Sequence, residues 1–522
     1  MKPFARNLIW MIPSSLGVGL TLSLLDGGTW WTGWLAYSSL LIIGLMGITA
    51  LWLSSGASRS LGLILLLSLT LRLGLAVATA LILPAHGYDT PVEQAGYVFA
   101  DAYHRDTQAW QLAVSGEPIW LAFDKSFSSD QYGGMLALSA LMYRVFSLDA
   151  HRPWLIAILA GLTATLGIGL AWKAVNKVWG QAMGTLVAGV LAFYPESLLY
   201  GSSQMREAFL ITFIIMVFLG VITWTEHPRR AWLWMASGTL GLILFSPGVA
   251  VIAVILMIVW SWLRGSQSAI SWRTVLITGV VILVAFSILM VGLSQDPYPG
   301  ETPLETAMRW LQLSASWDTY LLAEGSGWIQ NVFSRLPESL HLPFATAYGL
   351  TQPVLPAALA DPAAWPWKGL GIIRAVGWYS LLPFLVSGLI AAWQTSPKNE
   401  RRAWIWLWLA AWLWILLSSF RAGGDQWDNP RYRVILLLIQ AVLAAKTWLW
   451  WRETHNPWFI RIVAVEGVFL LAFTYWYFAR YTGWVAGQVH VFVILAIIGA
   501  AGLLILLGGW YWDYRSTRRK RT

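Results

Sequence analysis

The chain of 522 residues contains no cysteine, and only 11% of its residues are charged. The absence of cysteine excludes disulfide bonds and thiolate metal ligands, although it leaves the redox state of the compartment undecided. The scarcity of charge, together with 57% hydrophobic residues and a mean hydropathy of +0.61, excludes an ordinary soluble globular domain. We therefore interpret the chain as a polytopic membrane protein.

Several short enzyme motifs are also missing. The sequence has no Walker phosphate-binding loop, HExxH zinc motif, GxSxG nucleophile elbow or dinucleotide fingerprint in a suitable setting. The histidines, among them His86, His104, His341 and His490, do not have the spacing of metal ligands. We therefore assign no metal ligands and no definite cofactor, and a requirement for a divalent cation stays open.

Apolar runs of about 20 residues, each long enough to cross a bilayer, recur along the whole chain. The 37 tryptophans, among them Trp30 and Trp31, suit rings that settle at the boundary between lipid and water. The segment 232–263 is either two short spans or one helix kinked at Pro247. We predict an all-α transmembrane protein with about 14 spans, near residues 8–25, 30–53, 60–83, 152–172, 181–199, 205–224, 232–246, 248–263, 274–293, 372–393, 404–420, 433–451, 459–478 and 488–510.

Basic residues indicate the orientation of these spans. The 34 basic residues outnumber the 25 acidic ones, and the excess concentrates in short loops and in the C-terminal tail. This pattern indicates membrane topology rather than nucleic-acid binding, and it places both termini in the cytoplasm. The orientation requires that residues 132–148, which contain Arg144, form a helix in the membrane interface instead of crossing. We expect a bacterial inner membrane as the location, because no eukaryotic sorting signal is visible.

The spans and loops suggest four segments. Two large regions face outward, and the second is too long for a simple connector, so we expect a partly helical cap there. The predicted segments are two extra N-terminal spans in 1–59, a transmembrane core in 60–294 with an acidic outer loop at 84–151, a large outer-face cap in 295–371, and the C-terminal spans with a basic tail in 372–522.

The first cluster of ionisable residues lies in the outer loop. Asp101, Arg105 and Asp106 fall within six residues of one another. On a helix, Asp101 and Arg105 would form an i, i+4 pair on one face, while Asp106 would point elsewhere. One carboxylate would then be paired and the other free to act. The alternative is a solvated loop helix with an ordinary salt bridge.

A second cluster lies where two spans meet on the side that we predict to face outward. Glu196, Arg206 and Glu207 are embedded there among apolar residues and face the same compartment as Asp106. Charges at a helix end can simply mark the membrane boundary. Their density among apolar neighbours favours a functional role.

A third cluster surrounds the sequence DNPRYR. Arg421, Arg431 and Arg433 lie outside in our topology, against the usual preference for basic residues in the cytoplasm. They are compensated either locally, by Asp425 and Asp428, or by a lipid phosphate. A guanidinium suits phosphate because its planar fork binds two oxygens at once.

Arg72 stands apart, because it falls near the middle of its span with apolar residues on both sides. An arginine at the middle of a bilayer costs several kcal/mol unless it reaches a partner or an aqueous cavity. We expect a buried structural pair.

The three clusters, in this order, resemble landmarks of the GT-C superfamily of membrane glycosyltransferases, which includes the protein O-mannosyltransferases and the aminoarabinose transferase of lipid A. The similarity covers most of the chain and is strongest from residue 60 to residue 225. The chain departs from the family pattern because two spans precede the one that leads into the acidic loop. The matching landmarks are Asp106 with Trp110, Ala113 and Gly116, the helix at 132–148, the span ending at Lys173, the segment YPESLLYGSSQMREAFL, and NPRYRV.

This resemblance implies an enzyme that moves a sugar from a polyprenyl-phosphate donor to a glycan, lipid or protein acceptor at the outer face of the membrane, with inversion. Membrane lipids are the implied surroundings, and no nucleic acid is implied as a partner. Asp106 would be the general base that deprotonates the acceptor, and Asp101 competes for that role. The implied substrate-binding residues are Glu196, Arg206, Glu207, Arg431, Tyr432 and Arg433.

Two other classes of function stay open. A transporter or flippase of a lipid-linked molecule would carry ionisable residues and broken helices at mid-bilayer. Only Arg72 clearly fits that pattern, since the other charges concentrate on one outer surface. A non-catalytic membrane scaffold would show scattered rather than convergent carboxylates.

Overall fold

A computed structural model describes residues 2–264 and 327–519, apart from 125, 126, 128, 485, 486 and 488, together with isolated positions between 265 and 326. Within these residues the chain is helical and contains no strand. Seven helices of the described part of the chain are long and apolar enough to cross a membrane, or up to nine if each of two bent pairs is one span. The prediction of a helical membrane protein is therefore confirmed.

The total number of spans depends on shorter apolar helices and on residues outside the described ranges. The described residues also contain four shorter apolar helices, at Trp10–Leu25, Gly134–Phe146, Glu207–Thr223 and Pro247–Leu263. The predicted span at 274–293 and much of the cap at 295–371 lie outside the described residues. The count of about 14 spans is therefore not confirmed.

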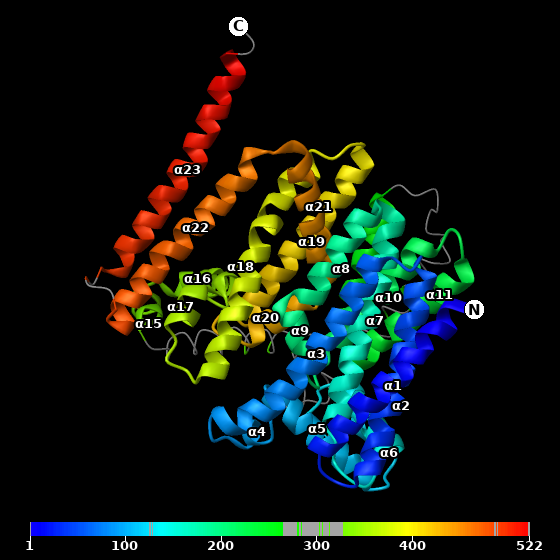
Figure 1. Cartoon of the computed structure of the whole chain (residues 1–522). Helices are drawn as coiled ribbons and strands as arrows, with labels where there is room; N and C mark the ends of the chain where they lie inside the picture. Colours follow the sequence, from blue (N-terminus) through cyan, green and yellow to red (C-terminus); the bar gives the residue numbers. More distant parts are fainter. Residues whose placement is uncertain are drawn as a thin grey trace. The chain divides into compact units, whose positions relative to one another are not determined.

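The chain forms two compact units, and the first comprises Met1–Pro297 and Val434–Ala441. Figure 1 shows the helices in sequence colours. Those of the first unit are α1 (Lys2–Leu25), α2 (Trp30–Ser54), α3 (Arg59–His86), α4 (Pro91–Gln94), α5 (Ala100–Val114), η1 (Ile119–Phe123), α6 (Gly134–Phe146), α7 (Trp154–Trp179), α8 (Gln181–Phe193), α9 (Pro195–Gly201), α10 (Glu207–Thr223), α11 (Pro228–Phe245) and α12 (Pro247–Leu263).

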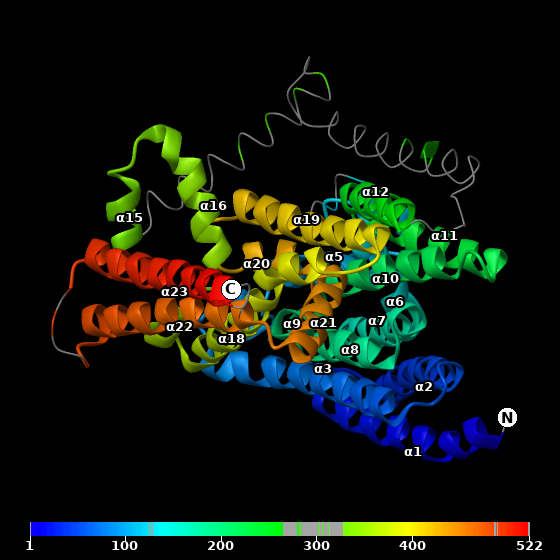
Figure 2. The ribbon, with the colours of Figure 1, turned by 90° about the horizontal axis from the view of Figure 1, so that it is seen from above.

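Helix α7 is the core of the first unit. It packs against α2, α3, α8 and α10, while α1 lies along α2 (Figures 1 and 2). Glycines on α7 let these neighbours approach, because a Cβ at Gly167 would lie 2.6 Å from Thr212 Oγ1 and one at Gly169 would lie 2.6 Å from Leu51 Cδ2. The sequence left open whether residues 232–263 form two spans or one kinked helix. They form two helices, α11 and α12, which are separated by the extended backbone of Ser246.

A sharp bend of 60° separates α8 from α9, which begins at Pro195. The bend leaves carbonyls at the end of α8 without helical partners, because a proline has no N–H to donate. Arg72, which is fully buried on α3, donates to the carbonyls of Leu191 at 3.1 Å and Ala192 at 3.2 Å, and to Ser197 Oγ at 2.9 Å. The expected buried structural role of Arg72 is thus observed, but its partners are backbone carbonyls and hydroxyls instead of a carboxylate.

The second unit comprises Tyr298–Arg433 and Val442–Thr522. Helices α22 and α23 lie side by side in it (Figures 1 and 2). Short helices occupy the described part of the predicted cap, and the four-segment division of the chain stays a prediction. The helices are α15 (Trp328–Phe333), η2 (Glu338–Leu340), α16 (His341–Thr351), α17 (Leu355–Ala360), α18 (Trp365–Trp393), α19 (Lys398–Arg421), α20 (Asp428–Val434), α21 (Leu437–Thr454), α22 (Pro457–Tyr477), the π-helical turn η3 (Phe478–Thr482) and α23 (Val491–Arg519).

Replacing Arg72 should destabilise the first unit. In Arg72→Leu the carbonyl of Ala192 would lose the donor Arg72, and that of Leu191 would keep only Ser197 Oγ. Each unmade buried hydrogen bond costs about 1–3 kcal/mol. We expect unfolding of the detergent-solubilised protein at a clearly lower temperature, corresponding to a loss of about 2 kcal/mol or more. Leu71→Ala is the control, because Leu71 is the adjacent residue and is 45% exposed. Equal melting of the two variants would contradict the structural role of Arg72.

Candidate functional site

Helix α5 carries the first cluster and separates its two carboxylates. Its buried face includes Arg105 and Asp106, whereas Asp101 is exposed in the first turn. The expected divergence of Asp101 and Asp106 is therefore observed. Arg105 lies on the buried face, where its Nε is 3.8 Å from Oδ1 of Asp130. Asp130 in turn accepts hydrogen bonds from the backbone N–H groups at the start of α6, so it ties α5 to α6.

Asp106 is buried and held by three donors. Its Oδ1 accepts a hydrogen bond from Tyr143 Oη at 2.6 Å, and its Oδ2 accepts one from Tyr97 Oη at 2.7 Å. Nε2 of His151 lies 2.8 Å from the same Oδ2. Burial, and then the neighbouring Asp106 carboxylate, raises the pKa of both tyrosines well above the ordinary value. Tyr97 and Tyr143 therefore stay neutral and keep donating.

His151 is the accessible end of this cluster. Its side chain is 29% exposed, whereas that of Asp106 is 1% exposed. The imidazole ring stacks on Trp110, with centroids 5.5 Å apart and planes inclined by 21°, and meets Tyr143 edge to face. A buried carboxylate that orients a partly exposed, ring-stacked imidazole is the arrangement that general-base catalysis uses.

His151 carries no functional signal in the sequence. It lies 45 residues from Asp106 and has no ligand-like spacing to any other residue. No local signal could have identified the pair, because only the packing of the segment before α7 against α5 brings the two residues together. The oxygens of Asp106 are buried and already bonded, and the expectation that Asp106 itself meets the acceptor stays a prediction.

The second cluster lies next to the first. Nη1 of Arg105 donates to the carbonyl of Gln204 at 3.3 Å, and the ring of Phe99 stacks on Tyr200. The guanidinium of Arg206 lies 5.4 Å from the ring centroid of Tyr132, in the loop before α6. The structure therefore brings the first two clusters together within one compact unit.

Arg206 is the accessible member of the second cluster. Its side chain is 14% exposed, and its Nε lies 3.9 Å from Oε1 of Glu207, which opens α10 and is 1% exposed. Glu196 is equally buried in the first turn of α9. The arrangement leaves Arg206, and not the two glutamates, able to meet a ligand directly.

The third cluster belongs to the second unit, and much of its charge is engaged locally. Nη1 of Arg431 lies 3.5 Å from Oδ1 of Asp428. The guanidinium of Arg433 covers the ring of Trp378 at 3.4 Å, and that of Arg421 covers the ring of Tyr432 at 4.4 Å. Arg431 thus follows the expected local pairing. That these residues share a ligand with Asp106 stays a prediction.

A polar anchor fixes the segment that carries His151. Arg152 donates to both carboxylate oxygens of Asp149, at 2.6 and 2.8 Å, and to the carbonyl of Thr29 at 3.0 Å. These hydrogen bonds to Arg152 hold the pKa of Asp149 well below its usual range. Because Thr29 precedes α2, Arg152 joins the first two helices to the loop before α7.

The described residues contain no group of three or more His, Asp or Glu side chains that could hold a metal ion. The oxygens of Asp106 already face three donors from Tyr97, Tyr143 and His151. This donor set does not fit a cation at Asp106.

Comparisons with known proteins give little further information. No protein-family model matches the chain, and no curated protein matches it. Among solved structures, the chain is similar to the archaeal oligosaccharyltransferase AglB from Archaeoglobus fulgidus, in complex with an inhibitory peptide and a dolichol-phosphate. The TM-score is 0.40 and the sequence identity 12%, over 86% of this chain and 54% of that one. The chain thus spans about half the length of that structure, and we assign no function from a similarity at this level.

The titration of Asp26, beside this anchor, should make stability depend on pH. Burial raises the pKa of Asp26 above its ordinary value, despite opposing effects of Tyr37, the Gly27 N–H, Arg152 and His151. A raised pKa in the folded state means that stability is lost as pH rises through that pKa. The Asp26→Asn variant has no carboxyl group that could lose a proton at this position. As the pH rises above the ordinary pKa of an aspartate, the melting temperature of the wild type should therefore fall relative to that of the variant. Parallel curves would contradict the burial of this carboxylate.

Proposed function

We propose that this protein is an integral membrane glycosyltransferase that moves a sugar from a polyprenyl-phosphate donor to a glycan, lipid or protein acceptor. The observation that carries the proposal is the hydrogen-bonded pair of His151 and Asp106, which shares one compact unit with the accessible guanidinium of Arg206. We propose that this base and this cation act at one site, where they would match the two charges that develop when an acceptor loses a proton and a phosphate leaves.

In the proposed step, His151 takes the proton of an acceptor hydroxyl while the oxygen attacks the anomeric carbon. A bond forms between that oxygen and the anomeric carbon, and the bond from this carbon to the phosphate oxygen breaks. The polyprenyl phosphate departs with the electron pair. A single displacement of this kind inverts the anomeric centre. Asp106 orients the imidazole of His151 and stabilises the imidazolium that forms.

The leaving phosphate is proposed to meet Arg206. A guanidinium is always charged and can donate to two phosphate oxygens at once. Glu207 and the ring of Tyr132 restrict the position of the Arg206 side chain from two sides. Glu196 is proposed to bind substrate in the same region, as the resemblance implies.

Four further residues are proposed to have the roles that the family resemblance implies. Asp101 stays the competing base, and its exposure on α5 keeps that role accessible to a substrate. Arg431, Tyr432 and Arg433 are proposed to bind the donor. We further propose that the reaction takes place at the outer face of a bacterial inner membrane, with both termini in the cytoplasm.

The proposal predicts that His151→Ala and Asp106→Asn both abolish sugar transfer. Loss of a positioned general base lowers a rate by about 100-fold to 10,000-fold. The test expresses each variant in a strain that lacks the gene and measures lipid-linked sugars and surface glycans by mass spectrometry. The expected result is accumulation of a lipid-linked sugar together with loss of a surface sugar.

His104→Ala is the matched control, because His104 lies on the same α5 helix as Asp106 but is exposed. This variant should restore transfer fully. Equal melting temperatures of the purified proteins would separate lost chemistry from lost folding. Full activity of Asp106→Asn would end the proposal, as would a deletion strain whose lipid-linked and surface sugars are unchanged. Altered movement of an intact lipid-linked molecule would instead favour a transporter.

A further inference from the structure

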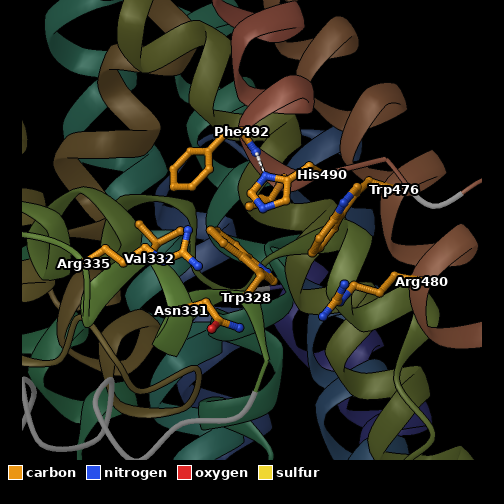
Figure 3. A pocket seen from close by; sticks show the side chains of 9 residues that line it. Trp328, Asn331, Val332, Arg335, Trp476, Arg480, His490 and Phe492 are labelled. Carbon is orange, nitrogen blue, oxygen red and sulfur yellow. Dashed lines mark hydrogen bonds between the residues drawn. The ribbon is translucent and has the colours of Figure 1, made fainter.

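A pocket in the second unit has an aromatic floor and a basic rim (Figure 3). Its volume is about 150 Å³. The lining side chains come from three places in the sequence: the region of α15, the end of α22 with η3, and the start of α23. They belong to Trp328, Asn331, Val332, Arg335, Trp476, Arg480, His490, Val491 and Phe492.

The floor is rigid. Trp328 and Trp476 are buried and meet edge to face, with ring centroids 5.9 Å apart. The indole N–H of Trp328 donates to Tyr477 Oη at 2.9 Å, and that of Trp476 donates to the carbonyl of Val489 at 2.8 Å. Because both indole N–H groups are used within the protein, the rings offer apolar faces and edges to a ligand.

The rim is positively charged and has no acidic counterpart. Arg335 and Arg480 are exposed at the pocket, and His490 and Asn331 add further polar groups. None of the pocket-lining residues carries a carboxylate. The ion pairs of the described residues involve neither arginine. In the described part of the chain, two guanidinium groups thus border one small cavity without an ion-pair partner. The guanidinium of Arg480 also lies 5.7 Å from the ring centroids of Trp476 and Tyr481.

The backbone adds to the attraction for an anion. Helix α23, 29 residues long, begins at the pocket with Val491. The N-terminus of a helix carries partial positive charge. At this one, Phe492 N–H donates to Nδ1 of His490 at 3.4 Å and Val493 N–H donates to the carbonyl of His490 at 2.9 Å, so the attraction comes from the helix dipole. Arg480 lies in the π-helical turn η3, a type of turn that frequently occurs at functional sites. Side chains and backbone therefore favour the same sign of ligand charge.

The size and position of the pocket limit the ligand. A cavity of about 150 Å³ holds a molecule about as large as benzene, so a complete nucleotide would not fit. Arg480 lies near the end of the candidate span Pro457–Thr482, and Val491 begins the next one. Residues at span ends lie at the level where lipid headgroups meet water.

We propose that this pocket binds a phosphate monoester, supplied either by a membrane lipid headgroup or by a small soluble phosphate ester. The phosphate would accept hydrogen bonds from Arg335 and Arg480, and the carbon skeleton of the ester would pack on Trp328 and Trp476. This site is independent of the proposed transferase reaction, because none of its residues belongs to the Asp106 and Arg206 clusters.

The test measures binding to the purified full-length chain. Radiolabelled glycerol 3-phosphate probes the soluble source by equilibrium dialysis in detergent. Native mass spectrometry with short-chain phosphatidic acid, compared with phosphatidylcholine, probes the lipid source. We expect saturable binding of at least one phosphate monoester, a decrease of at least tenfold in affinity for Arg480→Gln or Arg335→Gln, and loss of binding in the double variant. Arg480→Lys should retain part of the affinity, because it keeps the charge without the planar fork.

Arg402→Gln is the matched control, because it removes an exposed arginine of the same unit that does not line the pocket. Its affinity should stay within twofold of the wild type. Binding of phosphatidic acid alone would identify a lipid site, and binding of glycerol 3-phosphate would identify a soluble ligand. If both glutamine variants bind like the control, or if the wild type binds neither probe, the proposal is wrong. Sugar transfer by the pocket variants is measured separately, so failure of this proposal leaves the transferase assignment unaffected.

Discussion

The burial of Asp106 is the constraint on which the rest of the candidate site depends. A carboxylate out of contact with water is tolerated only when hydrogen-bond donors surround it. Its donors come from three segments: Tyr97 before α5, Tyr143 on α6, and His151 before α7. Satisfying one carboxylate therefore fixes the relative positions of these segments, and His151 is presented to solvent as a consequence.

Hydropathy predicts much of the membrane fold because the signal is local. The span expected at 30–53 is observed as α2 (Trp30–Ser54), and the short helix expected at 132–148 is observed as α6 (Gly134–Phe146). The pairings that build the site are not local. Arg105 was expected to face Asp101 on the same helix, yet it lies on the buried face with Asp106 and reaches Asp130, 25 residues later. His151 had no sequence signal for the same reason.

Arginines in apolar surroundings have two kinds of role in this chain, and their sequence context does not distinguish them. Arg72 and Arg433 are buried. Arg72 donates to backbone carbonyls of α8 and to the hydroxyl of Ser197 in α9, and Arg433 stacks on the ring of Trp378. Arg206 is partly exposed, and Arg480 is exposed. Arg206 and Arg480 also lie over aromatic rings, those of Tyr132 and of Trp476 and Tyr481. Exposure, rather than the aromatic contact, therefore distinguishes the arginines that are able to receive an anion.

The difference between structural and accessible arginines follows from how the backbone N–H and C=O groups near each arginine find hydrogen-bond partners. Where a proline breaks a helix inside an apolar layer, as at Pro195, the freed carbonyls need a donor that can reach several of them at once, and the fork of Arg72 provides it. At the start of α23, Phe492 N–H and Val493 N–H donate to His490, so these backbone groups are satisfied without an arginine. An arginine placed there, such as Arg480, keeps its donors for something other than the fold. The position of an arginine along a span therefore distinguishes the structural arginines from those that are candidates for binding a ligand.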